Sequence, residues 1–190
     1  MLKNKIKVFE NFVDRRTQEH IKDMMLGDFR IFPWYFIKDV TKDTKLGRPA
    51  MQHEFVSMET GQNSEHLDDI IPIVRKIKRS QIELLRVNAF LQFPNPNATS
   101  YDTPHFDLPK LQDKYTIIVY YVIDSDGETV IFDNKNKIIQ KIKPKQGTAV
   151  MFCGSLLHTA YQSKKQLRSI INFNINKTFE ENVKKIYENS

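Results

Sequence analysis

The chain has 190 residues, 40% of them hydrophobic, and this length predicts a single domain with a real core over 1–190. No apolar run reaches membrane-spanning length and no apolar signal segment follows the basic N-terminus, so we expect no membrane partner. Cys153 is the only cysteine, which excludes an internal disulfide and favours a reducing, cytoplasmic location. The net charge is +6, but the lysines are scattered along the chain, so nucleic-acid binding is not expected.

The first half of the chain, residues 1–80, predicts a helix-rich support. Helical spacing of apolar residues alternates there with short apolar runs and an aromatic segment around Pro33. In chain order we expect a strand over 5–9, a helix over 14–26 and an aromatic core strand or pocket wall over 31–36. A polar loop over 42–49, a strand over 51–58 and a helix over 64–78 follow. Segments 32–60 and 94–104, with Trp34, Tyr35, His53 and Tyr101, are expected to cover the mouth of the core.

From residue 81 the pattern changes to short strands separated by turns, with hairpin-type turn signals at 126–127 and 133–134. The expected strands are 81–93, 115–124, 128–133, 137–142, 147–153, 156–162 and 167–175. Closely spaced strands of this kind indicate a jelly roll over 81–176. A C-terminal helix over 177–190 begins at a capping box formed by Thr178 and Glu181. The fold class is therefore α+β and mainly β, a double-stranded β-helix (cupin-like) with flanking helices.

A metal-binding pattern lies in this second half. His105 and Asp107 are two residues apart, so in an extended segment both side chains point the same way, and His158 follows more than fifty residues later. Two imidazoles and one carboxylate form the facial triad typical of non-haem Fe(II) oxygenases. His-X-Asp alone is a weak signal, and the remaining histidines, His20, His53 and His66, are interpreted as satisfied core residues.

The strand around Arg168 alternates in a way that supports a ligand pocket. One face, mostly polar, carries Arg168, Ile170, Asn172 and Asn174. The other face is nearly all apolar and should pack against a covering layer; it carries Ser169, Ile171, Phe173 and Ile175. Arginine offers a planar fork to a carboxylate, so Arg168 is a candidate anchor for a dicarboxylate co-substrate. A salt bridge at the rim of the pocket is the alternative role for this side chain. Ser155 follows a glycine but lacks the pattern of a nucleophile elbow.

These motifs resemble those of the 2-oxoglutarate/Fe(II)-dependent dioxygenases, specifically the prolyl-hydroxylase-like branch. The chain is similar to small 2OG-Fe(II) oxygenases of tailed phages, of the cyanophage type. The likeness covers about residues 30–176 and is most specific over 85–175. The stretches that carry it are 105–107, 115–121, 127–132, 152–158 and 168–174, with 32–35 and 53–55 in the first half.

The resemblance implies that His105, Asp107 and His158 ligate iron and that Arg168 binds the C5 carboxylate of 2-oxoglutarate. Tyr121 matches a tyrosine that binds the same carboxylate in prolyl hydroxylases; plain core packing is the alternative. Related proteins often place a tyrosine where this chain has Gln92, and Gln92 and Asn88, on one face of their strand with Arg86, are candidate co-substrate or substrate contacts.

The implied cofactors are Fe(II), 2-oxoglutarate and O2, with ascorbate as a candidate reductant. The implied reaction is hydroxylation of a peptide or protein side chain, or of a small metabolite, with release of succinate and CO2. The resemblance places the enzyme in the cytoplasm, the host's if it is phage-encoded. Two alternatives stay open: a cupin-type Zn or Mn isomerase, and a non-catalytic phage structural or binding module.

Overall fold

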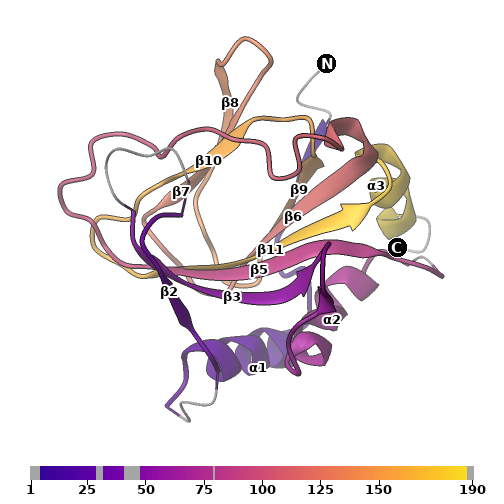
Figure 1. The fold of residues 1–190 in the computed structure, drawn as a ribbon, viewed down its shortest axis with the longest axis horizontal. Coiled ribbons are helices and arrows are strands. Elements are labelled where there is room, and N and C mark those ends of the chain that lie inside the picture. The colour runs from indigo at the N-terminus through magenta and orange to yellow at the C-terminus, as the bar shows by residue number, and fades with distance from the viewer. Residues whose placement is uncertain (1–4, 29–31, 41–47, 79, 188–190) are drawn as a thin grey trace.

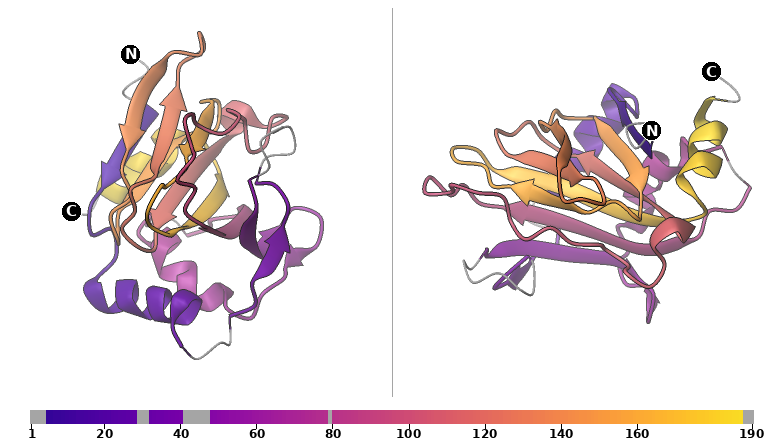
Figure 2. Two further views of the ribbon diagram at one scale, coloured as in Figure 1. Left: turned by 90° about the vertical axis from the view of Figure 1, so that its left-hand side faces the viewer. Right: turned by 90° about the horizontal axis from the view of Figure 1, so that it is seen from above.

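The computed structural model describes residues 5–28, 32–40, 48–78 and 80–187. In this part of the chain, two antiparallel β-sheets face each other and helices cover the outer side of the larger one (Figure 1; Figure 2). The mainly β architecture with flanking helices confirms the predicted double-stranded β-helix.

The larger sheet has eight strands, four from residues 1–80 and four from residue 81 onward. In spatial order they are β1 (Ile6–Phe9), β9 (Ala149–Cys153), β6 (Tyr115–Tyr121), β11 (Arg168–Asn176), β5 (Leu84–Gln92), β3 (Ala50–Ser57) and β2 (Tyr35–Ile37), and β4 (Gly61–Gln62) pairs with β3. The smaller sheet has the order β10-β7-β8, with β10 (His158–Tyr161), β7 (Glu128–Phe132) and β8 (Ile138–Ile142). The strands predicted from residue 81 onward are confirmed, each with slightly different ends.

Segment 101–105 extends the smaller sheet although it is too irregular to form a named strand. It joins β10 through bridges at two points, Tyr101 with Tyr161 and His105 with His158. Asp102 also donates its backbone N–H to the carbonyl of Ala160 at 2.8 Å. The end of the loop that follows β5 therefore lies beside β10 as an additional, irregular strand of the smaller sheet.

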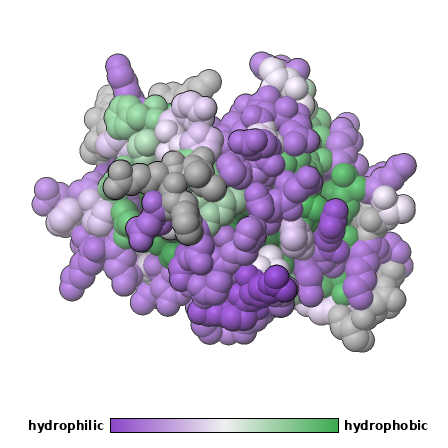
Figure 3. Space-filling model, turned by 90° about the horizontal axis from the view of Figure 1, so that it is seen from below, coloured by the Kyte–Doolittle hydropathy of each residue, from purple (hydrophilic) through white to green (hydrophobic). Residues whose placement is uncertain are grey.

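The outer face of the larger sheet is apolar because alternate strand residues must pack against helices. On β11, Ile171, Phe173 and Ile175 are fully buried. They belong to one core with residues of α1 (Arg15–Leu26) and α2 (Leu67–Arg75), and Figure 1 shows these helices lying along that face. The surface on this side exposes mainly hydrophilic residues (Figure 3). The alternation predicted for the Arg168 strand thus has its expected covering layer.

Side chains cap the N-termini of two helices. Asp14 accepts a hydrogen bond from the backbone N–H of Thr17, which caps α1. Before α3 (Phe179–Tyr187), Thr178 donates its N–H to Glu181 at 3.0 Å and accepts the N–H of Glu181 at 3.3 Å, which is the predicted capping box. No helix among the described residues is both long and apolar enough to cross a membrane.

Three expectations from the sequence need correction or fall outside the described residues. Asp126 and Gly127 do not close a hairpin, because β6 and β7 belong to different sheets, whereas the 133–134 turn does join the paired strands β7 and β8. Trp34 and His53 do not cover the mouth: the Trp34 indole donates to the carbonyl of Met25 on α1, and His53 is buried. Most of the polar loop expected over 42–49 lies outside the described residues.

Replacing Phe173 by Ala should lower the free energy of unfolding by about 3–5 kcal/mol, because a fully buried ring leaves a cavity between β11 and the helices. Urea denaturation followed by circular dichroism measures this loss. Phe36→Ala, at a position 64% exposed, is the matched control and should change stability by less than about 1 kcal/mol. Equal stability of the two variants would contradict the described core.

Candidate active site

Backbone pairing brings the three predicted metal ligands together. The backbone N–H of His105 donates to the carbonyl of His158 at 3.0 Å, and the reverse bond measures 3.2 Å. The two histidines therefore lie opposite each other on neighbouring segments of the smaller sheet. Asp107 lies two residues beyond His105, where the chain leaves the sheet and approaches the inner face of β11.

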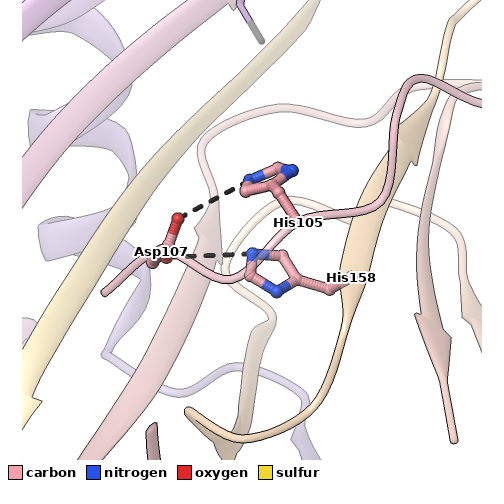
Figure 4. Close-up of side chains that lie close together, drawn as sticks. All are labelled: His105, Asp107 and His158. Carbon is pink, nitrogen blue, oxygen red and sulfur yellow. Dashed lines mark ion pairs between the residues drawn. The ribbon is translucent and has the colours of Figure 1, made fainter. Parts of the chain in front are cut away.

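The side chains of His105, Asp107 and His158 converge (Figure 4). His105 Nε2 is 3.6 Å from Asp107 Oδ1, and His158 Nε2 is 3.8 Å from Asp107 Oδ2. One ligand atom from each residue lies within 4.8 Å of the others. The side chain of His105 is 40% exposed, whereas those of Asp107 and His158 are 4% and 7% exposed, so the site opens on the His105 side.

The second nitrogen of each imidazole faces a backbone carbonyl. His105 Nδ1 lies 3.2 Å from the carbonyl oxygen of Thr103, and His158 Nδ1 lies 3.3 Å from that of Leu156. A carbonyl only accepts, so each Nδ1 carries a proton, and in the neutral ring this leaves Nε2 unprotonated. This is the tautomer that a metal ligand requires.

Asp107 is held by three donors in a buried environment. Asn172 and Asn174 donate to its Oδ2 at 2.8 and 2.9 Å, and Arg86 pairs with its Oδ1 at 2.7 Å. Burial would raise the pKa of Asp107, but the neighbouring His158, the hydrogen bond from His105 and the charge of Arg86 outweigh it and hold the pKa well below its usual range. The carboxylate is therefore ionised at neutral pH.

The protonation of the histidines follows from the same surroundings. Burial lowers the pKa of His158 to about 4, against the opposing attraction of Asp107. Burial acts in the same direction on His105, but the hydrogen bond to Asp107 and its charge prevail, so the pKa of His105 is raised. His158 is therefore neutral at pH 7, as a metal ligand must be.

Arg168 lies at the start of β11 with its guanidinium inside the barrel and 3% of the residue exposed. It donates to Gln92 Oε1 at 2.7 Å and to Thr129 Oγ1 at 3.0 Å, and its Nε has no partner among the described residues. Both acceptors are neutral, and no described carboxylate forms an ion pair with it. A buried cation without an anion is costly, so this arrangement favours an anionic ligand.

The other predicted co-substrate residues lie at different depths of the barrel. Gln92 is the direct cross-strand partner of Arg168, and Tyr121 donates its hydroxyl to Thr129 at 2.8 Å, beside the arginine. Asn88 lies further along β5, opposite Asn172, and its buried Oδ1 has no partner among the described residues. Gln92 and Tyr121 thus surround Arg168, whereas Asn88 lies nearer Asp107.

The residue just before β7 is Gly127, and a larger residue would not fit at this position. A Cβ atom at this position would lie 2.9 Å from the carbonyl oxygen of Tyr161 and 3.1 Å from Cδ of Arg168. The absent side chain therefore leaves room for the stem of the arginine. Thr129, two residues later, provides the hydroxyl that both Arg168 and Tyr121 contact.

A second buried ion pair closes the barrel near Arg168. Arg48, just before β3, donates to Asp102 Oδ1 at 2.6 Å, and Gln162 donates to Asp102 Oδ2 at 2.5 Å. This contact joins the edge of the larger sheet to segment 101–105. Since Asp102 is already paired with Arg48, it leaves Arg168 available to another anion.

Several contacts in the site were missed from sequence. Arg86, Asn172 and Asn174 were assigned to inward polar faces, but their convergence on Asp107 depends on the path of the long loop after β5. Thr129 carried no signal beyond its place after Gly127 and Glu128. The interpretation as a satisfied core histidine is confirmed for His53, whose ring nitrogens lie 2.8 Å from the Pro33 carbonyl oxygen and from Ser64 Oγ. It is wrong for His20, which is exposed and has its Nε2 2.7 Å from Asp69 Oδ1.

The donor set fits Fe(II) with 2-oxoglutarate. Two neutral imidazoles and one carboxylate suit a divalent transition metal and leave other positions for ligands. The unpartnered Nε of Arg168 and its neutral acceptors fit the far carboxylate of a dicarboxylate.

Comparison with known proteins agrees with this geometry. Residues 88–176 match the family model of the 2OG-Fe(II) oxygenase superfamily. A 2OG-Fe(II) oxygenase-family oxidoreductase from Burkholderia pseudomallei superposes with a TM-score of 0.72 at 12% identity, over 91% of this chain and 85% of the other. A search of curated proteins gives no match.

Two prolyl hydroxylases have related folds. One from Trichoplax adhaerens, solved with a peptide of hypoxia inducible factor, gives a TM-score of 0.67 at 14% identity, over 98% of this chain and 88% of the other. The viral collagen prolyl hydroxylase of Paramecium Bursaria Chlorella virus-1 gives 0.57 at 17% identity, over 92% and 97%. At these identities the likeness concerns the fold.

The fold and the family match together define a 2-oxoglutarate-dependent Fe(II) dioxygenase, with Fe(II), 2-oxoglutarate and O2 as its cofactors. More particularly, residues 88–176, which run from within β5 to the end of β11, match the 2OG-Fe(II) oxygenase superfamily, and the fold is similar to that of prolyl hydroxylases.

The loop that leads into Arg168 is fixed by a single carboxylate. Asp126 accepts the backbone N–H groups of Lys164, Lys165 and Gln166 at 3.0–3.2 Å, and the hydroxyl of Ser163 as well. Burial would raise the pKa of Asp126, but these hydrogen bonds prevail and lower it to about 2.

Because the folded pKa of Asp126 lies below its ordinary value of 3.8, its stabilising contribution is present above about pH 4 and is lost as the pH falls toward 2. Asp126→Asn should therefore cost about 1 kcal/mol at pH 7, after allowance for solvent screening, and less at low pH. Urea denaturation at pH 7 and pH 3 measures both values. A loss that grows on acidification would contradict this role.

Proposed function

We propose that the protein is a hydroxylase in which His105, Asp107 and His158 hold Fe(II) and Arg168 anchors 2-oxoglutarate. The observation that carries the proposal is the buried guanidinium of Arg168, which has only neutral partners, in the same barrel as the ligand cluster. A metal-only site has no use for such a cation.

In this proposal each side chain has a defined task. The Nε2 atoms of His105 and His158 and one oxygen of Asp107 bind the metal, while the carbonyls at Nδ1 fix the ring orientations. When bound, Fe(II) and 2-oxoglutarate supply the oxidising chemistry, in which O2 is consumed, succinate and CO2 are released, and the substrate is hydroxylated. The chain itself contributes binding, orientation and exclusion of water, and no catalytic acid or base is required.

The co-substrate would lie between the metal ligands and Arg168. Its far carboxylate would accept from the guanidinium, whose planar fork suits two parallel hydrogen bonds. Tyr121 and Thr129 add hydroxyl groups at the same place, and Gln92 fixes the arginine from the opposite side. Asn88, nearer Asp107, is the candidate contact for the metal-proximal end of the co-substrate or for the substrate.

The primary substrate would approach over the inner face of β2 and β3, next to the partly exposed His105. Register places Tyr35, Gln52 and Phe90 in one row across β2, β3 and β5 on this face, and Tyr35 is 64% exposed. An open surface of aromatic and amide groups suits a peptide or protein side chain, and a prolyl hydroxylase with a related fold was solved with a bound peptide. A small metabolite is the second candidate.

We further propose that the whole chain forms one domain. Helices α1 and α2, from the first half of the sequence, share a single core with strands of the second half. A reducing, cytoplasmic location is consistent with Fe(II) and with Cys153 as the only cysteine.

The decisive test is formation of succinate from 2-oxoglutarate by protein loaded anaerobically with Fe(II) and then exposed to air. Wild type should form succinate, with a higher rate when a suitable peptide or metabolite is added, and His105→Ala and Asp107→Ala should lose at least about 99% of it. His66→Ala, outside the barrel, is the control and should keep its activity. Equal succinate formation by wild type and both site variants would refute the assignment.

Arg168→Ala should raise the 2-oxoglutarate concentration needed for half-maximal succinate formation at least about tenfold, because the main charge opposite the co-substrate is lost. Metal binding, titrated with Co(II) by its visible absorption, should stay near the wild-type value, because Arg168 does not contact the ligand cluster. An unchanged 2-oxoglutarate requirement would remove Arg168 from the co-substrate site.

A further inference from the structure

Arg86 is the one described cation in direct contact with the ligand cluster. It lies on β5, and its Nη2 is 2.7 Å from Asp107 Oδ1. Its Nε donates to Asn174 Oδ1 at 3.0 Å, and Asn174 in turn donates to Asp107 Oδ2. Arg86, Asn174 and Asp107 therefore form a closed ring of hydrogen bonds from three different segments.

Counting lone pairs shows what this ring leaves for a metal. An ionised carboxylate offers about four acceptor positions, two on each oxygen. Asn172 and Asn174 occupy both positions of Oδ2, and Arg86 occupies one position of Oδ1. One position remains, on Oδ1, the oxygen that lies 3.6 Å from His105 Nε2. A metal at this site would share that oxygen with a guanidinium.

The charges of the cluster then sum to about zero. The two imidazoles must be neutral to bind a metal, and the charge of Asp107 is balanced by Arg86. A divalent cation bound there meets no net negative charge until another anion arrives. The dianion of 2-oxoglutarate is such an anion, and attraction between opposite charges falls only slowly with distance in a buried site.

We propose that Arg86 is a positioning residue that couples the two binding events: it weakens metal binding to the protein alone and thereby makes metal binding depend on 2-oxoglutarate. This inference rests on the proposed function of the site. By linkage, the metal strengthens 2-oxoglutarate binding by the same factor. The protein would hold its metal firmly only in the presence of the co-substrate.

The charge of Arg86 can be removed without disturbing the structure around it. Its side chain is 29% exposed, so its replacement opens no closed core cavity. Asn172 and Asn174 still hold Oδ2 of Asp107 when the arginine is changed. Glutamine at this position keeps a donor without the charge, and lysine keeps the charge without the planar fork.

The test is the dissociation constant of Mn(II), measured from the EPR signal of the free ion, without and with saturating 2-oxoglutarate. In wild type, 2-oxoglutarate should tighten Mn(II) binding at least about tenfold. Arg86→Gln should bind Mn(II) about tenfold more tightly than wild type without 2-oxoglutarate, and the tightening by 2-oxoglutarate should fall to about twofold or less. Arg86→Lys should keep most of the wild-type coupling, and Arg75→Gln, on the exposed surface of α2, is the control for net charge.

The coupling factor is the ratio of the Mn(II) dissociation constants without and with 2-oxoglutarate. It distinguishes an effect of the charge of Arg86 from an effect on the position of Asp107. A variant that only misplaces Asp107 weakens Mn(II) binding equally with and without 2-oxoglutarate. If Arg86→Gln does this, or keeps the wild-type coupling, the inference is overturned. Failure of the proposed function gives a different result, because Mn(II) binding would then be unaffected by His105→Ala, whatever residue occupies position 86.

Discussion

The short pairing of segment 101–105 with β10 is the interaction on which the site depends. Two backbone hydrogen bonds between His105 and His158 place imidazoles from remote parts of the chain side by side. The same pairing delivers Asp107 to the inner face of β11 and Asp102 to Arg48. Without it the barrel would lose an edge of its smaller sheet, and the charged residues of the interior would lose their partners.

Buried charge is arranged unevenly along the barrel. At the metal end the charge of Asp107 is balanced by Arg86, and two asparagines donate to the same carboxylate, whereas at the other end the guanidinium of Arg168 has neutral acceptors only. The described protein therefore carries an uncompensated positive charge in its interior at one end. That asymmetry gives a dicarboxylate a preferred direction, with its far end toward Arg168 and its other end toward the metal ligands.

The sequence allowed much of this to be predicted, because alternation and turn residues act locally. The strands from residue 81, the capping box at Thr178 and the two faces of the Arg168 strand all follow from near neighbours in sequence. The errors have a common cause in contacts between distant segments. The 126–127 turn was expected to close a hairpin, but Asp126 instead binds the loop after β10, and Trp34 turned toward α1. The contact of Arg86 with Asp107 depends in the same way on how a long loop crosses the barrel.

The opposition of His105 and His158 also bears on folding. The two residues are separated by more than fifty others, and bringing such distant points together costs conformational entropy. A metal bound by both would act as a reversible cross-link between segment 101–105 and β10, present only in the folded chain. Stability would then rise with the logarithm of the free metal concentration, so the protein's resistance to unfolding would report how much metal its surroundings supply.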